Sequence, residues 1–255
     1  MKRFVAIIIC MHCCLIMTYA QGFDWQTSPR APYQIPKRYI GLEIGSGYTH
    51  HYGSLEYIEQ EVGIVCCDYG SGSGFPLSIG VTGEQWITPT TSVVVGLGIT
   101  RFNAMFNTLS APVVLSNGKL LQTEYVLEGA LTYIALTGGV QTRLFGTHLT
   151  VGGGLRLLLN AGGSLNQEER VLTPADFLFT ENPRSRVKVL GNTFLDDATR
   201  LQIEPYVQIG YNLSVASGFY LSPSISIGIP LLTATGSGSW RMIDFGARIR
   251  LMKGL

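Results

Sequence analysis

The stretch LQIEPYVQIGYNLS, residues 201–214, alternates between two kinds of side chain over its whole length. Its odd positions are mainly aliphatic, and most of its even positions are polar or small. A period of two predicts a β-strand with one apolar and one polar face. A soluble sheet turns the apolar face to a core, whereas a membrane barrel turns it to lipid and lines its lumen with the polar face. The alternation alone leaves both arrangements open.

The same rhythm recurs along the chain. The segment near 122–144 is less regular and unusually long, which predicts a β-bulge or a register shift inside it. We predict eight strands, at about 39–51, 74–87, 91–106, 122–144, 148–162, 200–214, 218–232 and 239–252.

The connections between these segments alternate in length. Long connections are predicted at 52–73, 107–121 and 163–199, and short ones near 88–91, 145–148 and 216–218. Bacterial outer-membrane barrels have this order, because their periplasmic turns are short and their outer loops long. The connection before Trp240 is intermediate and would be the shortest outer loop.

The N-terminus has the layout of a secretory signal peptide. Lys2 and Arg3 form a basic start, a mostly apolar run follows as far as Met17, and Ala20 offers a small residue for cleavage. The run is shorter than the ~20 residues that an anchor helix needs. We therefore divide the chain into a signal peptide (1–20), a proline-containing lead-in (21–37) and one barrel domain (38–255).

Charge excludes several classes of protein. Charged residues make up 14% of the chain and the net charge is +1, so no basic face for nucleic acid is expected. Downstream of the signal peptide, no apolar run reaches the length of a membrane-spanning helix, which excludes a helical membrane protein.

The charges that remain are unevenly placed. Eleven of the 35 charged residues fall between Glu168 and Arg200, in the longest predicted connection. Nine others lie on the polar faces of strands, where we predict a balanced, structural network inside a narrow barrel rather than an ion path. These lumen residues are Glu43, Glu84, Glu128, Arg143, Arg156, Glu204, Asp244, Arg248 and Arg250.

Taken together, these patterns predict an all-β fold, an eight-stranded antiparallel up-and-down transmembrane β-barrel. Its apolar faces would turn outward to lipid. Aromatic residues near the segment ends are predicted to form interfacial girdles, namely Tyr39, Tyr48, Phe75, Trp86, Phe102, Tyr125, Phe219 and Trp240.

Three stretches resemble the outer-membrane protein beta-barrel domain family, the PorT-like and OmpA/OmpX-type small barrels. They are RYIGLEIGSGY at the first strand, YVLEGALTYIALTGGVQTRLFGTHLTVGGGLRLLL in the middle, and MIDFGARIRL at the end. The resemblance covers about Tyr39 to Leu251 and implies an eight-stranded antiparallel barrel without a fixed biochemical activity. Final strands of this family end on an apolar or aromatic residue, whereas here Leu251 is followed by Met-Lys-Gly-Leu.

No catalytic, cofactor or metal site is predicted, and we expect that the protein is not an enzyme. Of the histidines outside the signal peptide, His50 and His51 lie at one end of the barrel and His148 at the other. A lipid-modifying site would have to pair His50 or His51 with Ser54 or Glu56.

Cys66 and Cys67 are the two cysteines downstream of the signal peptide. An oxidising compartment favours their pairing, so we interpret them as a vicinal disulfide or as two packed thiols; a metal or partner contact is the alternative.

The favoured function is that of a monomeric integral protein of the bacterial outer membrane. Its role would be structural, adhesive or accessory to a surface or secretion machine, carried by the outer loops. The expected partners are outer-membrane lipid and a surface or secretion-machinery protein. General porin activity is not expected, because an eight-stranded barrel is filled by side chains. The alternatives are a soluble exported β-sandwich or lipocalin-like carrier, and a lipid-modifying barrel enzyme.

Overall fold

The computed structural model describes residues 37–53, 55, 69–144, 147–179, 186–216, 218–236 and 238–255. The predicted signal peptide, residues 1–20, lies outside them, as does the lead-in as far as residue 36. In this described part of the chain, no helix is both long and apolar enough to cross a membrane.

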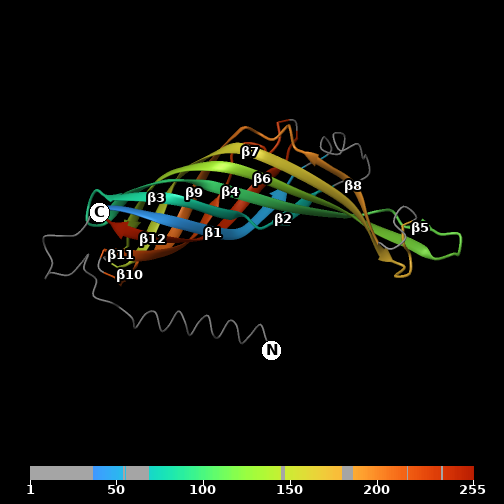
Figure 1. Cartoon of the computed structure of the whole chain (residues 1–255), viewed down its shortest axis with the longest axis horizontal. Coiled ribbons are helices and arrows are strands. Elements are labelled where there is room, and N and C mark those ends of the chain that lie inside the picture. The colour runs from blue at the N-terminus through green and yellow to red at the C-terminus, as the bar shows by residue number, and fades with distance from the viewer. Residues whose placement is uncertain are drawn as a thin grey trace, which may run out of the picture.

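Eight long antiparallel strands close into a ring (Figure 1). The last strand pairs with the first from Tyr39↔Gly254 to Tyr52↔Arg241, so the sheet has no open edge in the barrel wall. The predicted all-β fold, an eight-stranded antiparallel up-and-down barrel, is confirmed. In ring order the strands are β1 (Arg38–Tyr52), β3 (Leu77–Trp86), β4 (Thr91–Leu109), β6 (Leu120–Arg143), β7 (Leu149–Thr173), β9 (Leu201–Tyr211), β11 (Phe219–Gly228) and β12 (Arg241–Gly254).

Four short strands complete the sheet. β2 (Ser71–Gly74) continues the line of β3 after a break at Phe75 and Pro76, because proline has no N–H to donate to the ladder. β10 (Leu213–Ala216) pairs with β11 at the short-turn end of the barrel. β5 (Val113–Val114) and β8 (Val187–Phe194) pair with β6 and β7 at the opposite end.

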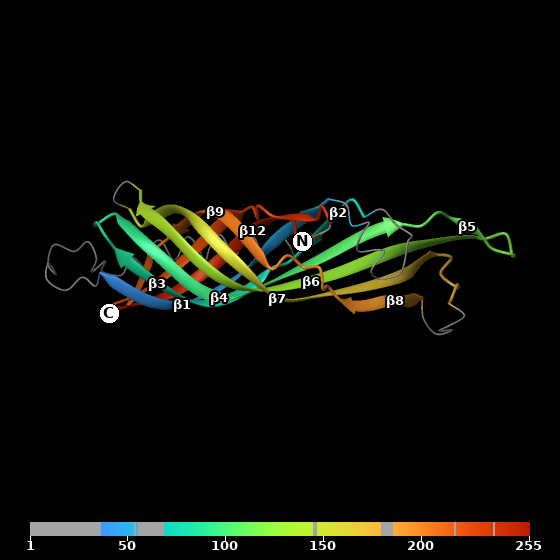
Figure 2. The ribbon, with the colours of Figure 1, turned by 90° about the horizontal axis from the view of Figure 1, so that it is seen from above.

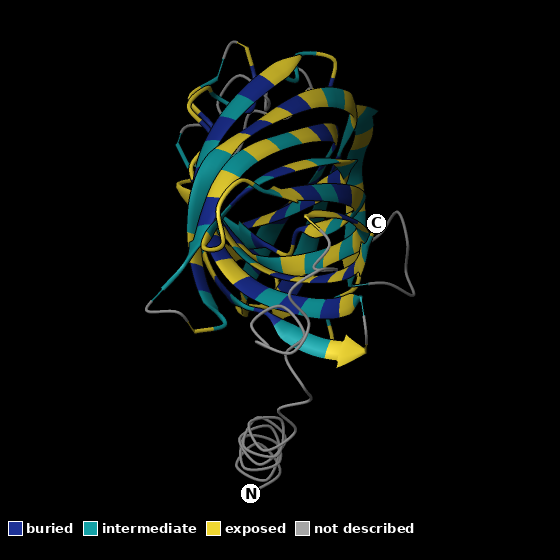
Figure 3. Ribbon diagram, turned by 90° about the vertical axis from the view of Figure 1, so that its left-hand side faces the viewer, coloured by how far each residue is buried: buried dark blue, intermediate teal, exposed yellow. Residues whose placement is uncertain are grey.

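Exposed and buried residues alternate along the barrel strands (Figure 3), and the exposed positions of the wall are mainly apolar. On β1, Ile40, Leu42 and Ile44 are 53%, 61% and 56% exposed. On β9, Val207 and Ile209 are exposed, whereas Gln202 and Glu204 are buried inside the ring. The polarity is the reverse of that of a soluble sheet, and it answers the question that the alternation in 201–214 left open. The apolar belt consists of outward Ile, Leu, Val and Phe side chains, including Ile40, Leu42, Ile44, Leu77, Ile79, Val81, Val95, Leu97, Ile99, Ile134, Leu136, Val151, Leu155, Leu157, Val207, Ile209, Ile225, Ile227, Phe245, Ile249 and Leu251.

Part of the sheet runs on beyond the barrel (Figure 2). β4, β6 and β7 are 19, 24 and 25 residues long, and β8 joins the free edge of β7. We call residues 104–109, 120–130, 163–173 and 187–194 the outer sheet, and the adjoining end of the barrel the mouth. The predicted long connections at 107–121 and 163–199 are therefore partly strand. The many charged residues of these segments indicated that they are in contact with water. A strand exposed to solvent accounts for those charges as well as a loop does.

The register shift predicted in the segment at 122–144 occurs in its pairing with β7, but the extra residues belong to β7. The register shifts between Gln122 and Thr123 and again between Thr132 and Tyr133, whereas the pairing with β4 is continuous. The second shift lies opposite Gly162. At this point the wall of the barrel passes into the outer sheet.

The predicted aromatic girdles are only partly correct. Phe75 is 67% exposed, and Tyr48 and Phe219 also face outward. Tyr39 and Phe102 are fully buried in the interior, and Trp240 is buried with them. Neighbouring positions of a strand face opposite sides of the sheet. A position near a strand end therefore does not determine whether an aromatic side chain faces outward or into the barrel.

Closure of the ring can be tested with a cysteine pair. Ser46 on β1 lies opposite Ala247 on β12, within the distance that a disulfide spans, so Ser46→Cys with Ala247→Cys should crosslink on oxidation. The full chain with its native cysteines replaced by serine is the background, and a mobility shift that reductant reverses is the readout. Leu42→Cys with Ala247→Cys, which is out of register, should stay uncrosslinked. Equal crosslinking of both pairs, or of neither, would contradict the β1–β12 ladder.

Candidate functional site

A layer of hydrogen bonds crosses the lumen near the short-turn end of the barrel, opposite the mouth. The Tyr220 hydroxyl on β11 donates to the Glu84 carboxylate on β3, and Gln141 Nε2 on β6 donates to Glu84 Oε1 at 2.8 Å. Gln141 Oε1 accepts from Arg250 on β12 at 3.0 Å, and Arg250 also donates to Ser222 at 3.3 Å. Four strands of the ring are joined through its interior in this way.

A layer of ion pairs lies next to it. Arg156 on β7 is 2.7 Å from Glu204 on β9 and 3.3 Å from Asp244 on β12, and all three side chains are buried. Arg248 lies 3.8 Å from Glu43 and 3.9 Å from Asp244. Burying these charges is costly unless each has an opposite partner, and here cation and carboxylate are interleaved. The space left among them is a cavity of about 40 Å³.

Seven of the nine predicted lumen residues lie in these two layers. Arg143 lies at the turn end of β6, where its guanidinium carbon is 4.2 Å from the centre of the Trp86 ring. The prediction for Glu128 is wrong, because its side chain faces outward, is exposed and pairs with Arg170. The physical reason is that the two faces of β6 exchange polarity along the strand. At the mouth the inward face is apolar, because it carries the buried side chains of Leu127 and Leu131.

An apolar cluster fills the mouth and was not predicted. Trp240, just before β12, has its ring centre 5.6 Å from that of Phe106 on β4. The indole reaches β6, which stands opposite β12 in the ring: a Cβ placed on Gly129 would be 3.2 Å from Trp240 Cη2. Its other members include Leu55, Tyr69, Phe102, Leu127, Leu131, Tyr133, Leu158, Leu165 and Met242. The lumen is therefore filled by side chains at this level too.

His51 is a structural part of this cluster. Its Nδ1 accepts a hydrogen bond from Trp240 Nε1 at 3.1 Å, and its Nε2 lies 3.1 Å from the carbonyl oxygen of Asn103. Both ring nitrogens are engaged, which fixes the neutral tautomer with the proton on Nε2. Ser54 and Glu56, the partners of the predicted lipid-modifying site, lie outside the described residues.

The other two described histidines lie at opposite ends of the barrel. His50 stacks beside Tyr52, and His148 contacts Tyr211 at the other end of the barrel. Cys66 and Cys67 lie outside the described residues. Among the residues that are described, no three His, Cys, Asp or Glu side chains are placed to hold a metal ion.

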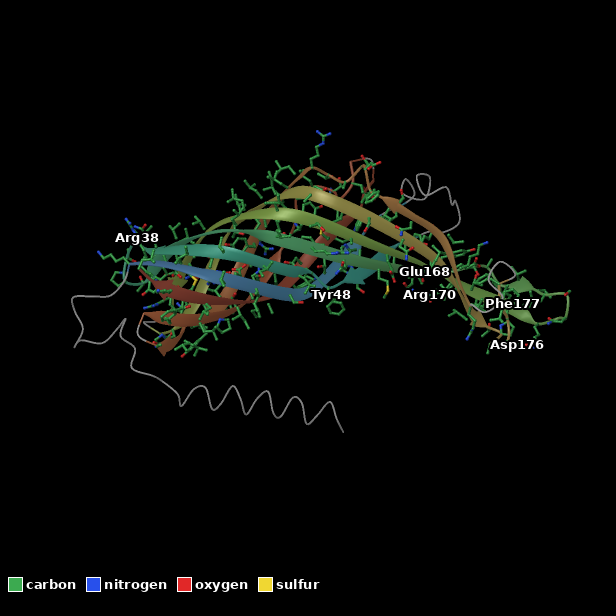
Figure 4. All side chains as sticks on the ribbon, viewed as in Figure 1. Arg38, Tyr48, Glu168, Arg170, Asp176 and Phe177 are labelled. Carbon is green, nitrogen blue, oxygen red and sulfur yellow. The ribbon has the colours of Figure 1, made fainter. Side chains whose placement is uncertain are left out.

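The outer sheet carries a cluster of charged side chains. Arg170 Nη2 donates to Glu168 at 2.9 Å and to Glu128 at 3.4 Å. The hydrogen bond to Glu168 raises the pKa of Arg170, so the guanidinium stays charged and holds the two carboxylates together. Glu168 and Arg170 lie near the root of the outer sheet (Figure 4).

The edges of the outer sheet carry exposed apolar side chains. On β8, Val189 and Phe194 are 61% and 78% exposed. β8 pairs with β7, and among the described residues no strand pairs with its other edge along 189–194. At the far tip, Lys119 and Asp176 form an exposed ion pair of 2.7 Å that joins the turn before β6 to the segment after β7 (Figure 4).

No family model matches the sequence, and no curated protein does. Among solved structures, the chain is similar to Neisserial surface protein A, with 13% identity and a TM-score of 0.39 over 84% of this chain and 96% of that one. It is similar to Ail, the attachment invasion locus protein of Yersinia pestis, with 10% identity and a TM-score of 0.33 over 85% and 99%. It is also similar to the outer membrane protease OmpT from Escherichia coli, with 10% identity and a TM-score of 0.33 over 86% and 96%. With TM-scores below 0.5, the description of the fold rests on the strand pairing of this chain.

The ion-pair layer is tested by a double-mutant cycle. Arg156→Met leaves Glu204 and Asp244 buried without their shared cation and should cost about 3–5 kcal/mol of unfolding free energy. Adding Glu204→Gln should recover part of that cost, because one uncompensated charge is removed. Urea unfolding in detergent micelles, followed by gel mobility, gives the free energies.

The matched control is Arg170→Met, which breaks an exposed ion pair and should cost less than about 1 kcal/mol. Additive effects of Arg156→Met and Glu204→Gln, or equal costs at Arg156 and Arg170, would show that the buried pair is not what stabilises the interior.

Proposed function

We propose that the protein is an integral β-barrel of the bacterial outer membrane whose outer sheet docks a protein partner. The observation that carries the proposal is the combination of an outward apolar belt with a sheet that projects beyond it. That sheet ends at β8, whose residues 189–194 pair only with β7 among the described strands. The belt supplies the anchor in lipid, and the outer sheet supplies the binding surface.

The dimensions of the belt support the membrane part of the proposal. On β1 the outward side chains from Ile40 to Tyr48 are all exposed and, apart from Ser46, apolar or aromatic. This is a run of nine residues, close to the ~9–11 that a tilted strand needs to cross a bilayer. Water would leave this belt uncovered, whereas lipid covers it. The resemblance of RYIGLEIGSGY and MIDFGARIRL to small outer-membrane barrels agrees with this location.

The filled interior argues for a role at the surface rather than for solute passage. Hydrogen bonds, ion pairs and the Trp240 cluster occupy successive levels of the lumen. An adhesive or secretion-accessory role, carried by the outer sheet, fits a rigid barrel that holds a projecting surface in place.

Strand addition is the mode of docking that the outer sheet supports. An exposed strand edge offers backbone donors and acceptors to an extended segment of a partner. Exposed side chains on that edge, here Val189 and Phe194, would add apolar contacts, and the neighbouring cluster of Glu128, Glu168 and Arg170 would add polar ones.

Membrane insertion is tested by charge at the belt. Ile209→Arg places a guanidinium on the lipid-facing side and should cost ~2–4 kcal/mol of folding free energy in phosphatidylcholine vesicles. Val114→Arg, at the exposed tip of the outer sheet, is the matched control and should leave the folding free energy unchanged. Urea titrations of the full chain provide both values. Equal tolerance of the two arginines would refute the lipid-facing belt.

Docking is tested in intact cells with a photo-crosslinking amino acid. Introduced at Phe194, on the open edge, it should give a covalent adduct with one protein; at Val114 it should give none. Val189→Asp in the same chain should abolish the Phe194 adduct, because a carboxylate at the edge removes an apolar contact and adds repulsion to the acidic cluster. An adduct at both positions, or one that survives Val189→Asp, would count against docking at β8.

A further inference from the structure

A groove of about 610 Å³ lies on the outer wall, where the outer sheet leaves the barrel. Five strands, β2, β4, β6, β7 and β8, and the break before β3 contribute to it. Its lining includes Phe75, Arg101, Asn103, Glu128, Asn166 and Asn192. It is separate from the lumen layers, and it borders β8, which contributes Val189 and Asn192 to its lining.

The lining has the chemistry of a saccharide site. Three side-chain amides can each donate and accept hydrogen bonds, as sugar hydroxyls do. Two of the amides are held in place: Asn103 accepts from Arg101 Nε at 3.3 Å, and Asn166 donates to Glu168 at 3.2 Å. Phe75 adds an exposed ring whose face could cover the apolar side of a sugar.

Charge makes an anionic headgroup the weaker candidate. The groove is lined by one cation, Arg101, and one carboxylate, Glu128. Phosphate groups are recognised by clusters of basic side chains, and a carboxylate in the same groove would repel them. A neutral, hydroxyl-rich group meets no such repulsion.

The height of the groove identifies where the saccharide would come from. Arg101 is two residues beyond Ile99, and Phe75 is two residues before Leu77; both apolar residues belong to the belt. At about 3.3 Å per residue, the groove begins within about 7 Å of the belt. That is the level of lipid headgroups.

We infer that this groove binds the saccharide headgroup of a neutral glycolipid in the surrounding leaflet. The inference rests on the proposed membrane location, because the acyl chains would lie along the belt below Phe75 and Arg101. A lipid held there would fill the angle between the wall and the outer sheet and would fix the sheet relative to the membrane.

The experiment is native mass spectrometry of the full chain in detergent, titrated with digalactosyldiacylglycerol. The glycolipid should bind at least ten-fold more tightly than phosphatidylglycerol and than free digalactose. Ala130→Trp, which fills the groove without removing a polar group, and Asn192→Ala should each weaken glycolipid binding about ten-fold. Asn107→Ala, on an exposed asparagine of β4 outside the groove, should not.

Three results would overturn the inference. They are unchanged glycolipid binding in both groove variants, equal or tighter binding of phosphatidylglycerol, and equal binding of free digalactose. Carbonate extraction of the same variants from vesicles separates the two proposals. Release of the wild-type chain into the supernatant would refute the membrane location, whereas retention of every variant with no glycolipid preference would refute the groove alone.

Discussion

Closure of the ring between β1 and β12 is the constraint on which the rest of the structure depends. Fourteen residue pairs join the two strands, so neither has an open edge along 39–52 and 241–254, and the outward side chains can be mostly apolar. A ring of eight strands is also narrow, and its inward side chains meet those of the opposite wall. The Glu84–Gln141–Arg250 chain, the Arg156 ion pairs and the Trp240 indole are consequences of that short span.

The change of polarity along β6 links the barrel to its surface. Within the belt, Ile134 and Leu136 face outward and Gln141 faces the lumen. Beyond the register shift at Thr132, Glu128 faces outward and Leu127 faces an apolar interior. One strand therefore has the pattern of a membrane wall over one half and of a soluble sheet over the other. The change places the end of the belt, the groove and the outer sheet within a few residues of each other.

Much of the barrel could be predicted because the alternation is a property of single strands. The rhythm in 201–214 predicted outward Val207 and Ile209, and the exposure of both side chains on β9 confirms this. The predictions that failed concern residues whose surroundings depend on which strands face each other across the ring. Glu128 was misplaced because the mouth reverses polarity, and Trp240 was assigned to a girdle because the sequence does not show that Gly129 stands opposite it. β8 was missed because its charged neighbourhood resembles a loop.

The central claim is that the apolar face of the ring is in contact with lipid and the outer sheet with water. Spin labels placed singly at Ile40, Leu42, Ile44 and Val189 of the full chain in bilayers test it by their accessibility to oxygen and to a water-soluble nickel chelate. The account predicts high oxygen and low nickel accessibility at the three β1 positions, and the reverse at Val189. Nickel accessibility at Leu42 or Ile44 equal to that at Val189 would contradict it.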